Sequence, residues 1–164
     1  KELVPIVVFL RPLGLRLCSK GFAETVTGLK FDYAHPQSLV NIYTKLQNKY
    51  PNANIVVTLE EHGALYQVNN QVKIMPGLKC NAVDTTGAGD IFHGAFVYGL
   101  ANNFDMDKIV TLANIAAGLS IQKMGSRLSI PMLSEVLDYY TKSINLNNQV
   151  SQSNQVNNNQ QGTK

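Results

Sequence analysis

The sequence has few cysteines and no long apolar run, and each shortage excludes a class of protein. Its two cysteines, Cys18 and Cys80, show no CxxC or Cys/His spacing. Neither a zinc site nor a disulfide framework is therefore predicted, and both cysteines are expected to be buried or partly buried thiols. No apolar run approaches the roughly 20 residues of a membrane-spanning helix. We expect no membrane contact and a cytoplasmic location.

Charge is also scarce. Charged residues make up 15% of the chain, and the net charge is +3. The fourteen Lys and Arg residues form no basic run with interleaved aromatic residues, so a nucleic-acid partner is not predicted. A hydrophobic content of 45% over 164 residues fits one globular domain with a real core. Residues 144–164 differ, because Asn and Gln dominate them, and they are predicted to form a disordered tail.

Helical and strand patterns alternate along the rest of the chain, which is typical of an α/β sheet. Asn69-Asn70 separates two alternating runs and predicts an antiparallel hairpin at the edge of the sheet. The first two strands are too close in sequence for a parallel crossover, and their pairing stays open. Strands are predicted near 6–10, 15–19, 54–59, 64–68 and 71–75, and helices near 22–26, 36–46, 90–101, 106–124 and 131–140.

A loop of small residues between two carboxylates carries the clearest chemical signal. It reads Asp84-Thr85-Thr86-Gly87-Ala88-Gly89-Asp90 and leads into an apolar helical stretch. Small residues let consecutive backbone N–H groups face one concavity, and the helix start adds its positive dipole end, so a phosphate can bind there. Asp90 is either a base that accepts a proton from an attacking hydroxyl or the N-cap of the helix. Asp84 is either a functional carboxylate or a tie that fixes the loop.

The string from Asp84 to Phe96 resembles the C-terminal signature of the ribokinase-like, or PfkB, carbohydrate kinases. Residues 57–65 resemble the nucleotide-binding strand and turn of that family, and residues 118–131 resemble its closing loop. Asn114 stands where the family places a residue against the adenine or ribose. The resemblance covers roughly residues 4–140.

The resemblance implies that residues 1–143 form the C-terminal part of a ribokinase-like α/β domain, with a mostly parallel sheet, flanking helices and an antiparallel edge hairpin. It implies transfer of the γ-phosphate of ATP to a hydroxyl of a small sugar or related alcohol. Magnesium would accompany ATP, and the closing loop binds potassium in many members. The family's lid, which often forms a homodimer interface, would belong to an N-terminal half that does not align with this chain.

Residue roles carry over position by position. Asp90 would be the base, and Gly87, Ala88 and Gly89 would form the anion hole. The nucleotide would be held by Thr58, Leu59, Glu60, Glu61, His62, Gly63 and Asn114, with Gly89 and Asp90 beside its phosphates. The potassium site would comprise Asp84, Thr86, Ser120, Lys123, Gly125 and Ser129, several of them through backbone carbonyl oxygens, which suit a hard cation.

The sequence also departs from the family pattern. Ser19-Lys20-Gly21-Phe22 stands where many members carry an Asn-x-x-Glu motif that places magnesium and phosphates, with Glu24 nearby as a substitute. Glu60 replaces a glycine of the nucleotide turn. These departures leave a second interpretation open, a truncated or degenerate member that binds nucleotide without catalysis. A nucleoside is the alternative acceptor to a sugar.

Overall fold

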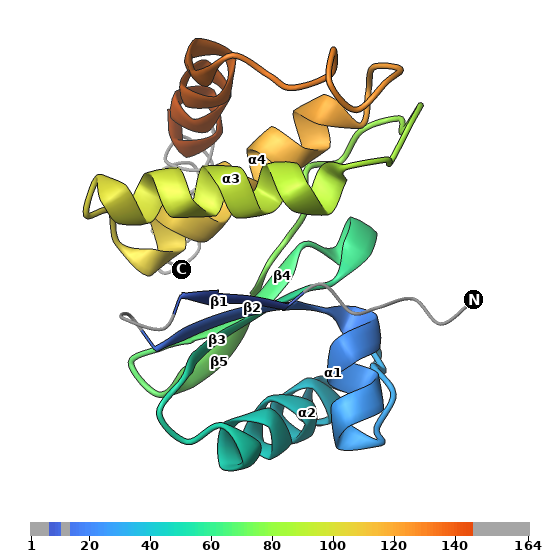
Figure 1. Ribbon diagram of the computed structural model, residues 1–164, viewed down its shortest axis with the longest axis vertical. Coiled ribbons are helices and arrows are strands. Elements are labelled where there is room, and N and C mark those ends of the chain that lie inside the picture. Colours follow the sequence, from blue (N-terminus) through green and yellow to red (C-terminus); the bar gives the residue numbers. More distant parts are fainter. Residues whose placement is uncertain (1–6, 11–13, 146–164) are drawn as a thin grey trace, which may run out of the picture. The chain divides into compact units, whose positions relative to one another are not determined.

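A computed structural model describes residues 7–10 and 14–145, and the chain divides into two compact units between Ile130 and Pro131. The first unit contains a sheet of five strands in the order β1-β2-β3-β4-β5, with helices on both faces (Figure 1). The strands are β1 (Val7–Leu10), β2 (Leu15–Ser19), β3 (Asn54–Thr58), β4 (Ala64–Val68) and β5 (Gln71–Met75). The helices are α1 (Lys20–Thr27), α2 (Pro36–Lys49), α3 (Ala88–Ala101) and α4 (Met106–Ser120), and a 3-10 turn, η2 (Glu60–His62), follows β3.

The predicted α/β class is confirmed, but the described strands do not form a mostly parallel sheet. Among them only β2 and β3 are parallel neighbours, and β1–β2, β3–β4 and β4–β5 are antiparallel. The lengths of the connections explain the difference. Residues 11–14 join β1 to β2 and residues 59–63 join β3 to β4, whereas a parallel crossover takes about a dozen residues or more. Only the segment with α1 and α2 is long enough, and it joins the parallel pair.

The edge hairpin predicted at Asn69-Asn70 is confirmed. β4 and β5 pair with Val68 opposite Gln71, so the two asparagines form a two-residue turn. Both have positive φ angles, 51° and 61°. Asparagine tolerates this left-handed conformation, which the tight turns of two-residue hairpins require.

The two faces of the sheet carry separate hydrophobic clusters because side chains alternate along each strand. One face packs against α3 and α4, and the other packs against α1 and α2 (Figure 1). The strand residues of the first face are Leu15, Leu17, Val56, Ala64 and Tyr66, and those of the second are Cys18, Ile55, Val57 and Leu65. Cys18 is therefore a buried thiol, as predicted, while Cys80 is partly buried.

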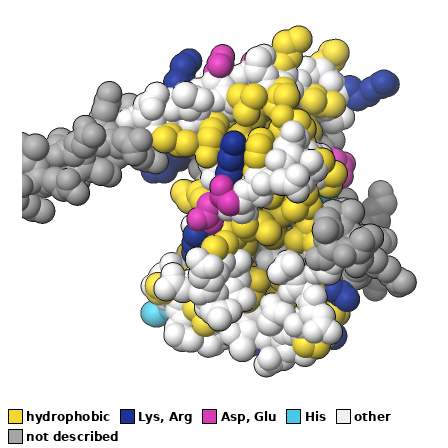
Figure 2. Space-filling view, turned by 90° about the vertical axis from the view of Figure 1, so that its left-hand side faces the viewer, with side chains coloured by type: hydrophobic (Ala, Val, Ile, Leu, Met, Phe, Trp, Pro, Cys, Tyr) yellow, Lys and Arg dark blue, Asp and Glu magenta, His cyan; other side chains and the backbone are white. Residues whose placement is uncertain are grey.

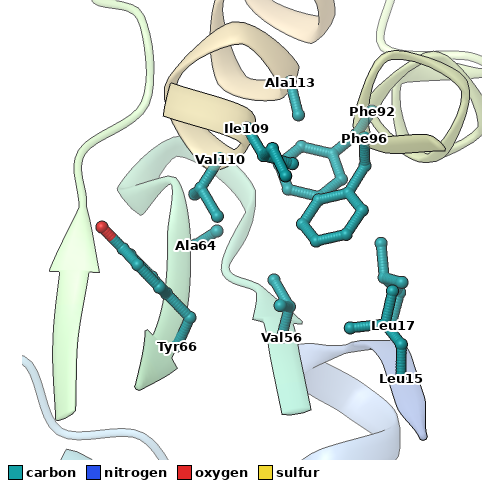
Figure 3. Packing of buried hydrophobic residues seen from close by; sticks show 10 residues of the cluster. All are labelled: Leu15, Leu17, Val56, Ala64, Tyr66, Phe92, Phe96, Ile109, Val110 and Ala113. Carbon is teal, nitrogen blue, oxygen red and sulfur yellow. The ribbon is translucent and has the colours of Figure 1, made fainter. Parts of the chain in front are cut away.

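Aromatic side chains of α3 fill the space between α3, α4 and the sheet. Figure 3 shows Phe96 directed toward Leu17 and Val56, with Phe92 beside it. Phe96 is completely buried. The two helices approach closely at Gly99, where a Cβ atom would lie 2.8 Å from Cγ1 of Ile109. This packing fixes the position of α3, whose first turn carries Asp90, the last residue of the loop 84–90 (the motif loop).

Helix α4 ends at Ser120, four residues earlier than the predicted end at Met124. The backbone beyond it turns, and Gly125 takes a left-handed φ of 87°. The carbonyl of Ile121, just past the helix, accepts hydrogen bonds from the N–H groups of Val83 and Asp84 at 2.7 and 3.1 Å. The predicted helical pattern is thus interrupted because this segment bonds to the motif loop instead.

The second unit begins at Pro131 and is helical over residues 133–145, as predicted. The predicted tail lies outside the described residues except for Ile144 and Asn145. Within the described ranges, no helix has the length and apolar character that crossing a bilayer requires. Figure 2 shows acidic and basic side chains scattered singly or in small groups over the face it presents.

Candidate active site

Gly87 turns the motif loop into helix α3. It is the N-cap residue, with a left-handed φ of 81°, a conformation that glycine adopts without steric cost. The N–H of Ala88 donates to the carbonyl of Thr85 at 3.3 Å. Within the described part of the chain, the N–H groups of Gly89 and Asp90 have no hydrogen-bond acceptor. The first turn therefore presents unsatisfied donors at the positive end of the helix dipole, which suits an anion.

Asp90 lies inside the first turn of α3 and is exposed to solvent. Because Gly87 is the N-cap, the alternative that Asp90 caps the helix is wrong. Its carboxylate accepts no hydrogen bond from any described residue. It therefore stands beside the two unsatisfied N–H groups, available to a ligand.

Asp84 ties the motif loop to the segment after α4. One carboxylate oxygen accepts the N–H of Thr86 at 2.9 Å, and the other accepts the N–H of Gly125 at 3.0 Å. Hydrogen bonds from the backbone and hydroxyl of Thr86, and from Gly125, hold the pKa of Asp84 below its usual value. Asp84 is thus held ionised as a bridge between the two loops. This agrees with the interpretation of Asp84 as a tie that fixes the loop.

The predicted cation-site residues lie in these two joined loops and, for Ser120, at the end of α4. Asp84, Thr86 and Gly125 are in direct contact. The Ser120 hydroxyl donates to the carbonyl of Ala117 at 2.7 Å, and the N–H of Lys123 donates to the carbonyl of Ser120 at 3.2 Å. Ser129 is buried, and its N–H donates to the carbonyl of Gly125 at 3.0 Å, whereas Lys123 is exposed.

The donor chemistry of this region is oxygen-only, which fits potassium better than a transition metal. The described residues include no cluster of three or more His, Cys, Asp or Glu side chains suited to a metal ion. Backbone carbonyl oxygens and the Asp84 carboxylate are the donors on offer. The loop 120–129 also lies against the anion site, because a Cβ atom on Gly87 would lie 3.1 Å from Cβ of Ser126.

The predicted nucleotide turn is a tight structure at the end of β3. The N–H of Leu59 donates to the carbonyl of Gly63 at 2.8 Å, and the N–H of His62 donates to the carbonyl of Leu59 at 3.0 Å. Leu59 is completely buried, so only its backbone can face a ligand. Gly63 has a φ of 93°, and a Cβ atom there would lie 2.1 Å from the carbonyl oxygen of Met75. This contact places the end of β5 directly beside the turn.

Two contacts at this turn could not be predicted from the sequence. Lys20 Nζ lies 3.1 Å from Oε2 of Glu60. The ring of His62 stacks on that of Tyr33, with centroids 3.6 Å apart. Neither pair is close in sequence, and the only signal was that Lys20 and Glu60 both stand at altered positions of the family pattern.

Asn114 is buried on α4, and its amide nitrogen donates to the carbonyls of Met75 and Pro76 at 2.9 and 3.2 Å. It thereby fixes the chain where it leaves β5. From there Gly77 packs against η2, with a hypothetical Cβ atom 2.9 Å from the carbonyl oxygen of Glu61. The chain then reaches Asp84 along α4, where Cys80 Sγ lies 3.4 Å from the carbonyl oxygen of Gly118.

The segment 76–84 therefore links the nucleotide turn to the anion site. Figure 1 shows η2 and the starts of α1 and α3 directed toward the same end of the sheet, where β2 and β3 finish. Ligands of open α/β sheets bind outside the carboxyl ends of the strands. The nucleotide turn and the start of α3 thus lie at the end of the sheet where ligands of such sheets bind.

Comparisons with known proteins find a family match over most of the chain. Residues 23–133 match the model of the pfkB family of carbohydrate kinases. The chain is 40% identical over 118 residues to the ribokinase of Staphylococcus aureus strain COL, covering 70% of this chain and 37% of the relative. It is 33% identical over 117 residues to the deoxyribokinase of Salmonella typhi, covering 71% of this chain and 37% of that protein.

A solved structure shows the same fold. The ribokinase of Cryptococcus neoformans var. grubii serotype A, in complex with ADP, superposes with a TM-score of 0.63 at 28% identity. The match covers 76% of this chain and 42% of that one. The predicted ribokinase-like fold is confirmed, and the chain spans less than half the length of the relatives it matches.

Proposed function

The chain belongs to the pfkB family of carbohydrate kinases, and from this premise we propose that it transfers the γ-phosphate of ATP to a hydroxyl of a small sugar or related alcohol. The observation that carries the proposal is the first turn of α3, where unsatisfied N–H groups and the Asp90 carboxylate stand together after left-handed Gly87. An anion site next to an available carboxylate suits phosphoryl transfer.

In the proposed reaction the acceptor hydroxyl oxygen attacks the γ-phosphorus. A new phosphorus–oxygen bond forms as the bond from the γ-phosphorus to the bridging oxygen breaks, and ADP leaves with that oxygen. Asp90 orients the hydroxyl and accepts its proton. The proposed anion hole is the backbone of Gly87, Ala88 and Gly89, but the N–H of Ala88 is already bonded to the Thr85 carbonyl. The unsatisfied N–H groups of Gly89 and Asp90 are therefore proposed to stabilise charge on the transferred group, and removal of one such donor costs about 10²–10³ in rate in other enzymes.

The nucleotide is proposed to lie along the turn from Thr58 to Gly63. Its backbone is fixed by its own hydrogen bonds and by the end of β5. Asn114 is proposed to act near the base or ribose by shaping residues 75–76, to which its amide is bonded. Because ATP is the proposed donor, we propose a cytoplasmic location, where ATP is available.

Magnesium is proposed to arrive bound to the phosphates of ATP, because the described residues around α1 do not fit a protein-held ion. Ser19 caps α1, accepting the N–H of Phe22 at 3.3 Å. The Glu24 carboxylate is bonded to Lys30 Nζ at 2.7 Å and to the N–H of Phe31 at 3.2 Å. Glu24 is therefore occupied, and no step is assigned to a magnesium ion held there.

Potassium is proposed to bind between the joined loops. The proposed ligands are carbonyl oxygens of residues 120–129 and the Asp84 carboxylate, with Thr86 on the same loop. A cation there would strengthen the positive field at the anion site, because Ser126 approaches Gly87 closely. We further propose that residues 1–143 are the C-terminal part of the kinase domain and residues 144–164 a separate tail.

A pentose is the first acceptor to test, because the relatives include a ribokinase and a deoxyribokinase. ADP release from ATP would be followed with ribose, deoxyribose, fructose and a set of nucleosides, with magnesium and with or without potassium. We expect turnover with a sugar and a higher rate with potassium. Faster turnover with a nucleoside than with any sugar would assign the nucleoside as acceptor instead.

A second candidate function, nucleotide binding without catalysis, is favoured by one observation. The altered residues Lys20 and Glu60 are bonded to each other at the nucleotide turn, so the chain departs from the family pattern in this part of the candidate site. ATP binding without ADP release on any acceptor of the panel would favour this function and contradict the kinase proposal.

A further inference from the structure

Lys20 and Glu60 meet because two parallel strands end side by side. In the register of β2 and β3, Ser19 lies opposite Thr58. Lys20 follows Ser19 directly, and Glu60 opens η2 two residues after Thr58. The ammonium lies 3.1 Å from the Glu60 carboxylate, at the end of the sheet where the nucleotide turn is found.

Glu60 occupies a backbone conformation that disfavours it. Its φ is 58°, in the left-handed region, which costs residues with a Cβ atom more than it costs glycine. Among the described residues, the other non-glycine positions with positive φ are all asparagine, a residue that tolerates this region. A long acidic side chain at such a position points to a function of the carboxylate.

The surroundings of Lys20 keep its ammonium charged and close to the turn. The hydrogen bond to Glu60 is the main cause that raises the pKa of Lys20, and the Glu24 carboxylate contributes. The Lys20 Nζ lies 5.8 Å from the centroid of the Tyr33 ring, which in turn stacks on His62. The buried Tyr33 hydroxyl has no hydrogen-bond partner in the described structure.

We propose that Lys20 binds a phosphate group of the nucleotide, and that Glu60 holds the Lys20 ammonium at the turn until that phosphate replaces the carboxylate. The inference rests on the proposed function, whose site it deepens. The side chain of Lys20 is 27% exposed and that of Glu60 is 64% exposed. The Lys20 side chain is therefore the less exposed member of the pair.

The chemistry of the pair suits such an exchange. Lysine binds phosphate as a compact charge on a flexible stem, so its ammonium can change partner without backbone movement. Ion pairs near the surface contribute little to stability, so the bond to Glu60 can be given up readily. Lys20 thus supplies positive charge in the stretch where the Asn-x-x-Glu motif is missing.

The test is calorimetric titration of the 164-residue chain with ADP and, separately, with adenosine. Lys20→Met is expected to weaken ADP binding about tenfold or more, as loss of a hydrogen bond to a charged group does. It should leave adenosine binding unchanged, because adenosine has no phosphate. Lys30→Met is the matched control, since Lys30 pairs with Glu24 on the same unit, and it should change neither affinity.

A double-variant cycle separates an exchange from a fixed structural pair. Glu60→Gln is expected to tighten ADP binding by a few-fold, because it removes the competing carboxylate. The double variant, with both Lys20→Met and Glu60→Gln, should have the same ADP affinity as the Lys20→Met variant. Thermal unfolding of each variant checks its fold, and Glu60→Gln is informative even if Lys20→Met does not fold.

Three results would overturn the inference. Lys20→Met could bind ADP like the wild type, or lose ADP and adenosine equally, or Glu60→Gln could bind ADP more weakly than the wild type. In each case the wild-type chain still binds ADP and the proposed function stands. A wild-type chain that binds neither ADP nor ATP would contradict the proposed function, and this inference with it.

Discussion

Asp84 and Asp90 belong to the same loop and helix start, yet their surroundings give them different roles. Asp84 accepts two backbone N–H groups at 2.9 and 3.0 Å and is fixed as an ionised bridge. Asp90 is exposed beside unsatisfied N–H groups. The Asp84 carboxylate, bonded to two backbone N–H groups, holds the loops together, and the exposed Asp90 carboxylate is the one proposed to meet the acceptor hydroxyl.

His93, one turn after Asp90, should make stability depend on pH. Burial lowers the pKa of His93 below its usual 6.5, while the Asp90 charge opposes that shift. The unfolded chain therefore binds a proton more readily than the folded one. The contribution of neutral His93 to stability is present above pH 6.5 and lost as pH falls through the lower folded-state pKa.

The measurement is urea unfolding of the wild type and His93→Gln at several pH values from about 7.5 down to about 5. We expect the free energy of unfolding of the wild type to fall more steeply toward acid than that of the variant. Parallel curves for the two proteins would show that His93 does not titrate as described.

At the residue scale, local patterns predicted the turn at Gly87 and the helix start after it, but not the contacts between distant residues. Gly87, Ala88 and Gly89 indicated an anion site because small residues and a helix start are local features. The bond from Gly125 to Asp84 spans 41 positions, and the pair of Lys20 and Glu60 spans 40. Such contacts depend on how the strands and helices pack, which no local pattern contains.

At the scale of elements, the segment 76–84 connects the two halves of the candidate site. It leaves β5 under Asn114, passes η2 at Gly77 and reaches the Ile121 carbonyl through Val83 and Asp84. Both the nucleotide turn and the anion site therefore contact one continuous backbone. A change at one end of this segment is expected to disturb the other.

Elements with local signals were predicted well. Pro36 marked the start of α2, Gly28 marked the end of α1 with a left-handed C-cap, and the two asparagines marked the β4–β5 hairpin. The direction of strand pairing was predicted less well, because it depends on connection length and on which strands become neighbours. The end of α4 was placed too late because its last predicted turn bonds to another loop.

Gly63 tests the contact between η2 and the end of β5. Gly63→Ala would place a Cβ atom 2.1 Å from the Met75 carbonyl oxygen and 2.4 Å from the Gly77 nitrogen, at a left-handed φ. Backbone atoms cannot move aside as a flexible side chain can. We expect a loss of more than about 2 kcal/mol in the free energy of unfolding, measured by urea denaturation.

Gly21→Ala is the matched control, because a Cβ atom there meets no atom within 4 Å. It lies in α1, where alanine is favoured over glycine, so we expect it to be stabilising by up to about 1 kcal/mol. Equal stability of the two variants would mean that η2 does not lie against β5 as the structure describes.

At the scale of the whole molecule, one continuous stretch of sequence carries the family match. The family match covers residues 23–133, which include the nucleotide turn, the anion site and the joined loops. These parts are proposed to position a phosphate and a base. The chain spans 37% of its ribokinase relative, so the acceptor is identified by assay rather than from the residues of this site.

The most direct test of the account is the rate of ADP release by Asp90→Asn, with the acceptor that gives turnover in the wild type, measured together with ATP affinity. Asp138→Asn, an exposed aspartate in the helix of the second unit, is the control and should behave as the wild type. Asparagine cannot accept the proton but keeps the shape of the side chain. We predict that Asp90→Asn lowers the rate by about 10²–10⁴, with ATP affinity within about twofold of the wild type because the backbone anion site is unchanged. An Asp90→Asn variant that releases ADP at the wild-type rate would contradict the role of Asp90 as the base.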